Sequence, residues 1–391
     1  MLNMHKSFFE KFIIYFFISL PSAAWRLLRM PFYKKKNVEY KQIVIFQLGH
    51  LGDMFVTLPL IRNLRYNCPE SHLALVVGEW NKQIAQTIPE VDHVIIFNHF
   101  FFDRTKTTSI FQFIKYFRHF MKQLNNDHYD LGIDLRGFIN TIFPLYFSNI
   151  GLLAGFNYKH QGALLDIKIP LYDTVYESER LLALLPQIGL REFIPKYNFD
   201  SYPFQDHAAE SFLAENNIHL GEVIIGIFPG APYAPRRWPA DNFARLIEKI
   251  TDTDQGSVII MGSSNDQKTV FDVMHHLRNK VALMISDDIV MLMSIIRRCS
   301  IFVSNDSGPL HIAIAMDIPT VSLFGPGNEK RWGMNRFPHR IVRGSVSCSP
   351  CLLKSDTCDN PSVKCMEKIS VDSVYDATLE ILQATAKPKN K

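Results

Sequence analysis

The sequence lacks several features that would indicate a common class of protein. Its 391 residues include only six cysteines, and Lys and Arg outnumber Asp and Glu by only four. Such sparse cysteine does not indicate a disulfide scaffold, and so small a charge excess does not indicate a nucleic-acid partner. The sequence also contains no Walker loop, no HExxH motif and no nucleophilic serine elbow. These absences exclude the usual signatures of P-loop hydrolysis, zinc proteolysis and serine hydrolysis.

Most of the positive charge lies in residues 1–40. This segment has seven basic and two acidic residues, a net charge of +5, and the remaining 351 residues carry −1. Its uncharged run, 12–25, is shorter than the roughly 20 residues that a membrane-spanning helix needs. The mixture of aromatic and basic residues is typical of a helix on an anionic cytoplasmic membrane surface. A secretory signal and a helix packed on the protein's own core remain open as alternatives.

The first half of the chain alternates short apolar runs with segments of helical spacing. We expect strands at 41–47, 72–77, 93–97 and 129–134, and helices at 54–66 and 81–88. Such alternation is typical of a parallel sheet with helices on both faces. The sequence therefore predicts an N-terminal Rossmann-like α/β domain over 41–195.

The same pattern restarts after a segment without strand signal, which we expect to hold a linker at 196–222. Strands are expected at 223–228, 257–261, 282–286, 301–304 and 320–324, with helices at 241–250 and 371–386. This predicts a second doubly wound domain over 223–386, followed by a basic tail at 387–391. Two such domains facing a central cleft would bind a ligand between the carboxyl ends of their sheets.

An insert at 97–121 interleaves phenylalanine with lysine and arginine. One interpretation is a second lipid-facing surface. The other is an amphipathic helix whose apolar side packs on the sheet.

The first glycine-rich loop comprises Gly49-His50-Leu51-Gly52-Asp53, between an expected strand and an expected helix. Glycines allow a ligand to approach the backbone, and a helix N-terminus favours negative charge. The spacing does not match the dinucleotide fingerprint. Asp53 is either the helix N-cap or a carboxylate that accepts a proton from a nucleophilic hydroxyl.

The second domain opens with a similar loop, which holds Gly230 and the neighbouring Arg236 and Arg237. Two guanidinium groups beside a strand-to-helix loop are suited to clamp a diphosphate, because arginine presents paired donors. A solvated basic loop is the alternative interpretation.

A polar stretch at 304–311 follows another expected strand and enters a helix. The backbone amides of Ser307 and Gly308 are placed to donate hydrogen bonds to phosphate oxygens. Asp306 would repel a phosphate, so we expect it to cap the helix, accept ligand hydroxyls or orient the loop. A purely structural turn remains open.

Four cysteines, Cys348, Cys351, Cys358 and Cys365, lie within eighteen residues. Their grouping has metal-ligand character, although the second pair lacks the close spacing of a zinc ribbon. A structural zinc site, reduced free thiols and disulfides are the three alternatives.

Taken in order, these motifs resemble those of glycosyltransferase family 9, the ADP-heptose:lipopolysaccharide heptosyltransferases. The resemblance covers about 41–382, and its motifs lie at 46–53, 57–59, 130–137, 230–239, 305–311 and 323–326. It implies a GT-B fold of two Rossmann-like domains. It also implies inverting transfer of a sugar, with no cofactor or metal required for catalysis.

The resemblance also assigns roles to residues. Asp53 matches the general base, and Gly49, Gly52 and Arg136 lie on the acceptor side. The residues implied for the donor, ADP-heptose, are Gly230, Arg236, Asp306, Ser307, Gly308 and His311. The implied acceptor is a lipopolysaccharide core or related lipid-linked glycan, which predicts a cytoplasmic enzyme peripherally bound to the inner membrane. A non-catalytic GT-B nucleotide- or glycan-binding protein and a GT-B sugar epimerase are the alternative functions.

Overall fold

The computed structural model describes residues 39–385 with short gaps, at 99–109, 171–173, 195, 198, 200–201, 220, 352–357 and 359–363. The predicted membrane-surface segment at 1–40 therefore falls almost entirely outside the described residues. The basic tail at 387–391 and the start of the phenylalanine-rich insert also lie outside them. None of the helices in the described part of the chain is long and apolar enough to cross a bilayer.

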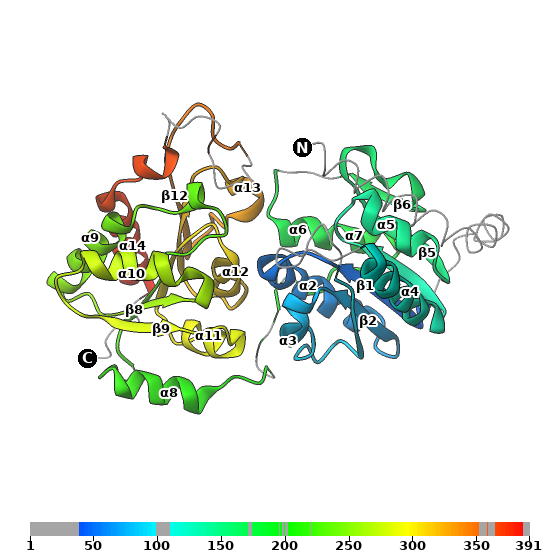
Figure 1. The fold of residues 1–391 in the computed structure, drawn as a ribbon, viewed down its shortest axis with the longest axis horizontal. Helices are drawn as coiled ribbons and strands as arrows, with labels where there is room; N and C mark the ends of the chain where they lie inside the picture. Colours follow the sequence, from blue (N-terminus) through cyan, green and yellow to red (C-terminus); the bar gives the residue numbers. More distant parts are fainter. Residues whose placement is uncertain are drawn as a thin grey trace. The chain divides into compact units, whose positions relative to one another are not determined.

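The chain divides into two compact units, which are coloured in sequence order in Figure 1. The first unit extends to Tyr172 and includes Ser178–Tyr197. The second unit comprises Asp173–Glu177 and the chain from Asn198 onwards.

The first unit is built on a six-stranded parallel sheet in the order β3-β2-β1-β4-β5-β6. Its strands are β1 (Gln42–Gln47), β2 (His72–Val77), β3 (His93–Ile96), β4 (Tyr129–Asp134), β5 (Ile150–Asn157) and β6 (Ile167–Pro170). Its helices are α2 (Leu51–Asn67), α3 (Lys82–Ala85), α4 (Ile110–Asn126), α5 (Ile139–Tyr146), α6 (Glu177–Leu182) and α7 (Leu184–Gln187). The first residue of α6, Glu177, belongs to the second unit.

The strand order explains why helices cover both faces of this sheet. From β1 the chain moves outward to β2 and β3, and it then crosses back to β4, β5 and β6. Because such crossovers are right-handed, α2 and α3 lie on one face and α4 and α5 on the other. Side chains of α4 and α5 share one hydrophobic core with β1, including Phe46, Phe117, Phe120 and Phe143.

The second unit repeats this plan, with a parallel sheet in the order β12-β11-β10-β7-β8-β9. Its strands are β7 (Ile224–Phe228), β8 (Ser257–Gly262), β9 (Ala282–Ile285), β10 (Ile301–Asn305), β11 (Thr320–Phe324) and β12 (His339–Arg343). Its helices are α8 (Asp206–Glu215), α9 (Ala240–Asp252), α10 (Gln267–His276), α11 (Ile289–Ile296), α12 (Gly308–Ala315), α13 (Glu329–Trp332) and α14 (Val371–Thr385). Trp238, Phe243, Met366 and Tyr375 belong to the core beneath this sheet.

The structure confirms the predicted fold class, two doubly wound α/β units. It also contains three strands that the sequence did not reveal, β5, β6 and β12. The helix expected at 54–66 begins earlier, at Leu51. The range expected as a linker, 196–222, contains α8, which packs on α11 through bonds such as Gln205 N–H to Ser294 Oγ at 2.8 Å.

Candidate functional site

The first candidate site lies where the strand order of the first sheet reverses. β1 pairs with β2 on one side and with β4 on the other. In open α/β sheets, ligands bind outside the carboxyl ends of the strands at such a switch point. The glycine-rich loop follows β1, and Arg136 follows β4.

A buried glutamine at the end of β1 fixes the glycine-rich loop from the inside. Gln47 Oε1 accepts the Gly49 N–H at 3.1 Å. Its Nε2 donates to Thr57 Oγ1 at 2.5 Å and to the Asp53 carbonyl at 3.2 Å. One side chain therefore ties the loop to the first turns of α2.

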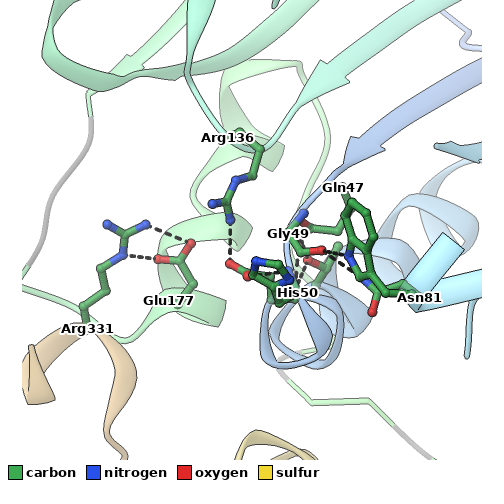
Figure 2. Close-up of polar contacts among 10 residues, drawn as sticks. Gln47, Gly49, His50, Asn81, Arg136, Glu177 and Arg331 are labelled. Carbon is green, nitrogen blue, oxygen red and sulfur yellow. Dashed lines mark hydrogen bonds and ion pairs between the residues drawn. The ribbon is translucent and has the colours of Figure 1, made fainter. Parts of the chain in front are cut away.

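Two residues that follow β2, Trp80 and Asn81, also bond to this loop, and Figure 2 shows Asn81 beside Gly49. Trp80 Nε1 and Asn81 Nδ2 both donate to the Gly49 carbonyl, at 2.7 and 3.0 Å. The Trp80 ring also lies beside the His50 ring, with centroids 5.8 Å apart. Sequence reasoning missed Gln47, Trp80 and Asn81, and the available signal was that they flank the ends of neighbouring parallel strands.

Asp53 is the third residue of α2, so its interpretation as the helix N-cap is wrong. The N-cap residue is His50, whose N–H donates to Asp53 Oδ2 at 2.8 Å. Asp53 thus completes a capping box from within the helix. Arg136 Nη1 approaches the other carboxylate oxygen, Oδ1, at 2.6 Å. The carboxylate is held at both oxygens, while its side chain remains 15% exposed.

Arg136 is carried on a turn that a buried carboxyl group supports. Asp134, the last residue of β4, accepts the Gly137 N–H at 2.6 Å, and Gly137 has a φ of +74°. Burial raises the pKa of Asp134 to about 6, against the hydrogen bonds and the nearby guanidinium that lower it. The structure thus brings the predicted residues Gly49, Asp53 and Arg136 together in one network.

The second candidate site occupies the corresponding position in the second unit. β7 pairs with β8 and β10, and the strand order again reverses at β7. Arg236, which follows β7, forms an ion pair with Asp306, which follows β10, with Nη1 and Oδ2 2.9 Å apart. The Asp306 side chain is only 6% exposed. Asp306 does not cap the helix, because the N-cap residue of α12 is Ser307.

The loop that carries Arg236 is closed by a buried amide. Asn305 Nδ2 donates to the Pro229 carbonyl at 2.8 Å, and Asn305 Oδ1 accepts the Trp238 N–H at 3.1 Å. Ser304 Oγ lies 3.1 Å from Ser307 Oγ and joins this network to the start of α12. The predicted donor-site residues Arg236, Asp306 and Ser307 therefore come together in the second unit.

Two glycines in this unit are required by close carboxylate packing. A Cβ on Gly327 would lie 2.2 Å from Asp306 Oδ2, and one on Gly230 would lie 2.2 Å from Asp266 Oδ1. His311, on α12, is buried and packs edge-on against Trp332 with ring centroids 5.6 Å apart. The predicted residues Gly230 and His311 are thus placed by packing as well as by position in the loop.

A third ion pair holds Glu177, which belongs to the second unit. Arg331 donates through Nε and Nη2 to the two carboxylate oxygens of Glu177, at 2.6 and 3.3 Å (Figure 2). Glu177 is nearly buried, at 5% exposure. A bidentate pair of this kind fixes orientation as well as position.

The cysteine cluster shows no metal-binding arrangement in the part of the chain that the structure describes. Cys348 and Cys351 are exposed and Cys365 is buried, and burial raises the pKa of the Cys365 thiol. Among the described residues, none of the six cysteines is in a disulfide. Parts of the loop, 352–357 and 359–363, lie outside those residues, so the zinc site stays a prediction.

Comparison with known proteins identifies the family. The family model of glycosyltransferase family 9 (heptosyltransferase) matches residues 117–361, more than half of the chain. The chain belongs to this family. It is therefore an enzyme that transfers a sugar, and the non-catalytic and epimerase alternatives are not favoured.

Individual relatives agree with the family model. Lipooligosaccharide heptosyltransferase 2 of Haemophilus influenzae is 25% identical over 300 residues, covering 73% of this chain and 83% of that protein. The crystal structure of a family 9 glycosyltransferase from Veillonella parvula has a TM-score of 0.75 at 20% identity, covering 90% and 100% of the two chains. E. coli heptosyltransferase WaaC with ADP-2-deoxy-2-fluoro heptose has a TM-score of 0.63 at 15% identity, covering 88% and 100%. These structures share the GT-B fold with the family 9 chain.

Proposed function

We propose that this family 9 glycosyltransferase moves a heptose from ADP-heptose to a lipopolysaccharide core or a related lipid-linked glycan. The family description names heptosyl transfer. The Haemophilus relative is named for a lipooligosaccharide, and the E. coli structure contains an ADP-heptose analogue. The observation that carries the proposal is the partly exposed Asp53 carboxylate, which His50 and Arg136 hold at the switch point of the first sheet.

The proposed reaction is a single in-line displacement with inversion. An acceptor hydroxyl attacks the anomeric carbon, the glycosidic bond forms, and the bond to the nucleoside diphosphate breaks. Asp53 accepts the hydroxyl proton as general base, a role that requires a fixed carboxylate at hydrogen-bonding distance. Arg136 orients that carboxylate through its ion pair with Oδ1.

The leaving diphosphate needs positive charge, which we assign to the second unit. Arg236 supplies a guanidinium group, and the backbone amides of Ser307 and Gly308 lie at the start of α12. Such groups stabilise charge most effectively when they are oriented before the reaction begins. Asp306 provides that orientation for Arg236, so its negative charge serves to position the guanidinium.

A donor and acceptor assay tests this function directly. The enzyme should release ADP from ADP-heptose only when a heptose-deficient lipopolysaccharide core is present, and the acceptor mass should rise by one heptosyl unit. Transfer from a different nucleotide sugar, with ADP-heptose inactive, would overturn the donor assignment. Slow interconversion of a nucleotide sugar without acceptor would instead indicate an epimerase.

The proposed mechanism requires no metal ion. The initial rate should therefore be unchanged in excess EDTA. Inhibition by EDTA that Mg²⁺ reverses would overturn this part of the mechanism. A slow loss of folded protein in EDTA, without an immediate change in rate, would instead support a structural metal at the cysteine cluster.

We further propose that the enzyme works at the cytoplasmic surface of the inner membrane, where a lipid-linked acceptor resides. The net charge of +5 in residues 1–40 and their aromatic content support a surface anchor. Deleting residues 1–36 should weaken binding to anionic vesicles and spare turnover on a soluble acceptor fragment. Unfolding of the truncated protein would show that this segment belongs to the core.

A further inference from the structure

Helix α4 of the first unit has one face in the core and an opposite face that is basic. Phe117, Phe120 and Leu124 are fully buried against the sheet. Lys115, Arg118 and Lys122 are exposed. At about 100° per residue, these three project from one stripe on the side of the helix opposite Phe120. The structure thus confirms the amphipathic interpretation of this part of the insert and shows what its outer face presents.

Aromatic side chains accompany the basic stripe. Phe111 lies one turn before Lys115 on the same stripe and is 80% exposed. Tyr116, on the flank of the helix, is 58% exposed. A phenylalanine this exposed gains nothing from the core of its own unit, so its packing does not explain its presence.

The positive charge on this face is not neutralised locally. The sequence has no Asp or Glu from 104 to 126. Lys115, Arg118 and Lys122 form no ion pair with any residue in the described part of the chain. Exposed arginines of the second unit behave differently, since Arg278 pairs with both Glu248 and Asp252.

We propose that the outer face of α4 binds the anionic surface of a phospholipid bilayer, with Phe111 entering the headgroup region. Basic residues gain attraction from anionic headgroups, and an aromatic ring among them gains from the interfacial apolar layer. A neutral or basic partner would not match the unbalanced charge of this face. The inference rests on the proposed function in one respect, that a lipid-linked acceptor requires the enzyme at a membrane.

The test uses the full chain and vesicles of phosphatidylglycerol and phosphatidylcholine in equal amounts. The triple variant Lys115→Gln, Arg118→Gln, Lys122→Gln keeps good helix formers while removing three charges. Vesicle binding should fall roughly 100-fold, because each basic residue near an anionic leaflet contributes about fivefold. Phe111→Ser should weaken binding at high salt as well as low salt, whereas the charge contribution should fade as salt rises.

A matched control removes three exposed charges from the second unit, by Lys268→Gln, Lys280→Gln and Lys368→Gln. This control should bind vesicles like the unchanged protein. Equal losses in the two triple variants would show a general charge effect and overturn the proposal. Unchanged binding of the α4 variant would overturn it too. The proposal would also be wrong if the unchanged protein did not bind vesicles and instead self-associated through α4.

Turnover on a soluble acceptor fragment separates this proposal from the proposed function. The α4 variant should keep that turnover, because its changed side chains lie on the outer face of the helix. If vesicle binding depends on α4 and no donor supports transfer, the surface stands and the proposed reaction is wrong.

Discussion

The two units carry the same kind of ion pair at the same place in their sheets, with the charges exchanged. In the first unit the carboxylate, Asp53, follows the first strand, and the guanidinium of Arg136 follows the fourth. In the second unit the guanidinium of Arg236 follows the first strand, and the carboxylate of Asp306 follows the fourth. One scaffold thus presents a carboxylate at one switch point and a guanidinium at the other.

The burial of the two carboxylates separates their roles. Asp53 is 15% exposed, whereas Asp306 is 6% exposed and has the Gly327 backbone packed against it. A partly exposed carboxylate can meet a substrate hydroxyl, whereas a nearly buried one is better suited to orient its partner. The difference in burial supports the proposed division of roles, with proton transfer in the first unit and recognition of anions in the second.

The largest effect should come from removing the carboxylate of the first pair. Asp53→Asn keeps the size of the side chain but cannot accept the acceptor proton, so kcat should fall about 10²-fold or more. Donor affinity should stay nearly constant, as measured by titration with ADP.

The matched change in the second pair is the control for that result. Asp306→Asn should raise the donor KM more than it lowers kcat, because it loosens Arg236. Equal kcat losses in the two variants would remove the distinction between the units. Normal turnover in a folded Asp53→Asn protein would leave Asp53 with a capping role alone.

A second difference between the units is the residue that ends the fourth strand. It is Asp134 in the first unit and Asn305 in the second, and both are fully buried. With a folded pKa of about 6, Asp134 keeps its proton in the fold at pH values where the unfolded chain has lost it. Its stabilising contribution is complete below about pH 4 and is lost as the pH rises through 6. The free energy of unfolding should fall by about 3 kcal/mol across that range, at about 1.4 kcal/mol per pKa unit.

Asp134→Asn places at the end of the fourth strand the same residue type as in the second unit, and it should remove this dependence of stability on pH. Urea unfolding between pH 4 and 7 should show that the variant lacks this loss of stability. Parallel pH profiles for the variant and the unchanged protein would contradict the prediction.

Removing the guanidinium of the second pair should have a slightly smaller effect. Arg236→Ala should weaken ADP binding by about 1.5–3 kcal/mol, the range for a charge-assisted hydrogen bond. Adenosine binding should barely change, since it has no phosphate, and calorimetric titration of both ligands measures the contrast. Equal losses of affinity for the two ligands would indicate that the buried Asp306 carboxylate, without the Arg236 guanidinium, had destabilised the fold.

The smallest effect should come from the support of the glycine-rich loop. Asn81→Ala removes one of two donors to the Gly49 carbonyl and should cost about 1 kcal/mol of stability. Trp80→Phe removes the other donor and is the matched variant. The double variant should cost more than the sum, because the buried carbonyl then loses both partners, and thermal unfolding of all three proteins tests this.

The sequence predicted the strands whose apolar residues are contiguous and missed those whose signal is diluted. β2, β4 and β11 lie within the predicted bounds, and each is almost entirely buried. β5 contains Gly151 and Gly155, which weaken a strand signal, and β12 has only two aliphatic residues, flanked by histidine and arginine. Sheet pairing stabilises these strands, so local preference alone does not identify them.

The residues of the candidate sites also divide into those that the sequence predicted and those that it did not. The loop motifs identified Asp53, Arg136, Arg236 and Asp306, but their pairing depends on which strands are neighbours. That information is non-local, because it depends on the order of the strands in each sheet. Supporting residues such as Asn81 were marked only by their place at the end of an expected strand, because their role exists only once β2 lies beside β1.

Asn305 has a consequence for the cost of binding. Its side chain forms hydrogen bonds with both Pro229 and Trp238 and so connects the two ends of the loop that carries Arg236. A loop closed in advance has fewer conformations to lose when a ligand arrives, so less of the ligand's binding energy is spent on ordering it. We therefore expect the loop that carries Arg236 to bind its ligand without rearranging. The rate of association should then depend on diffusion and charge more than on movement of the loop.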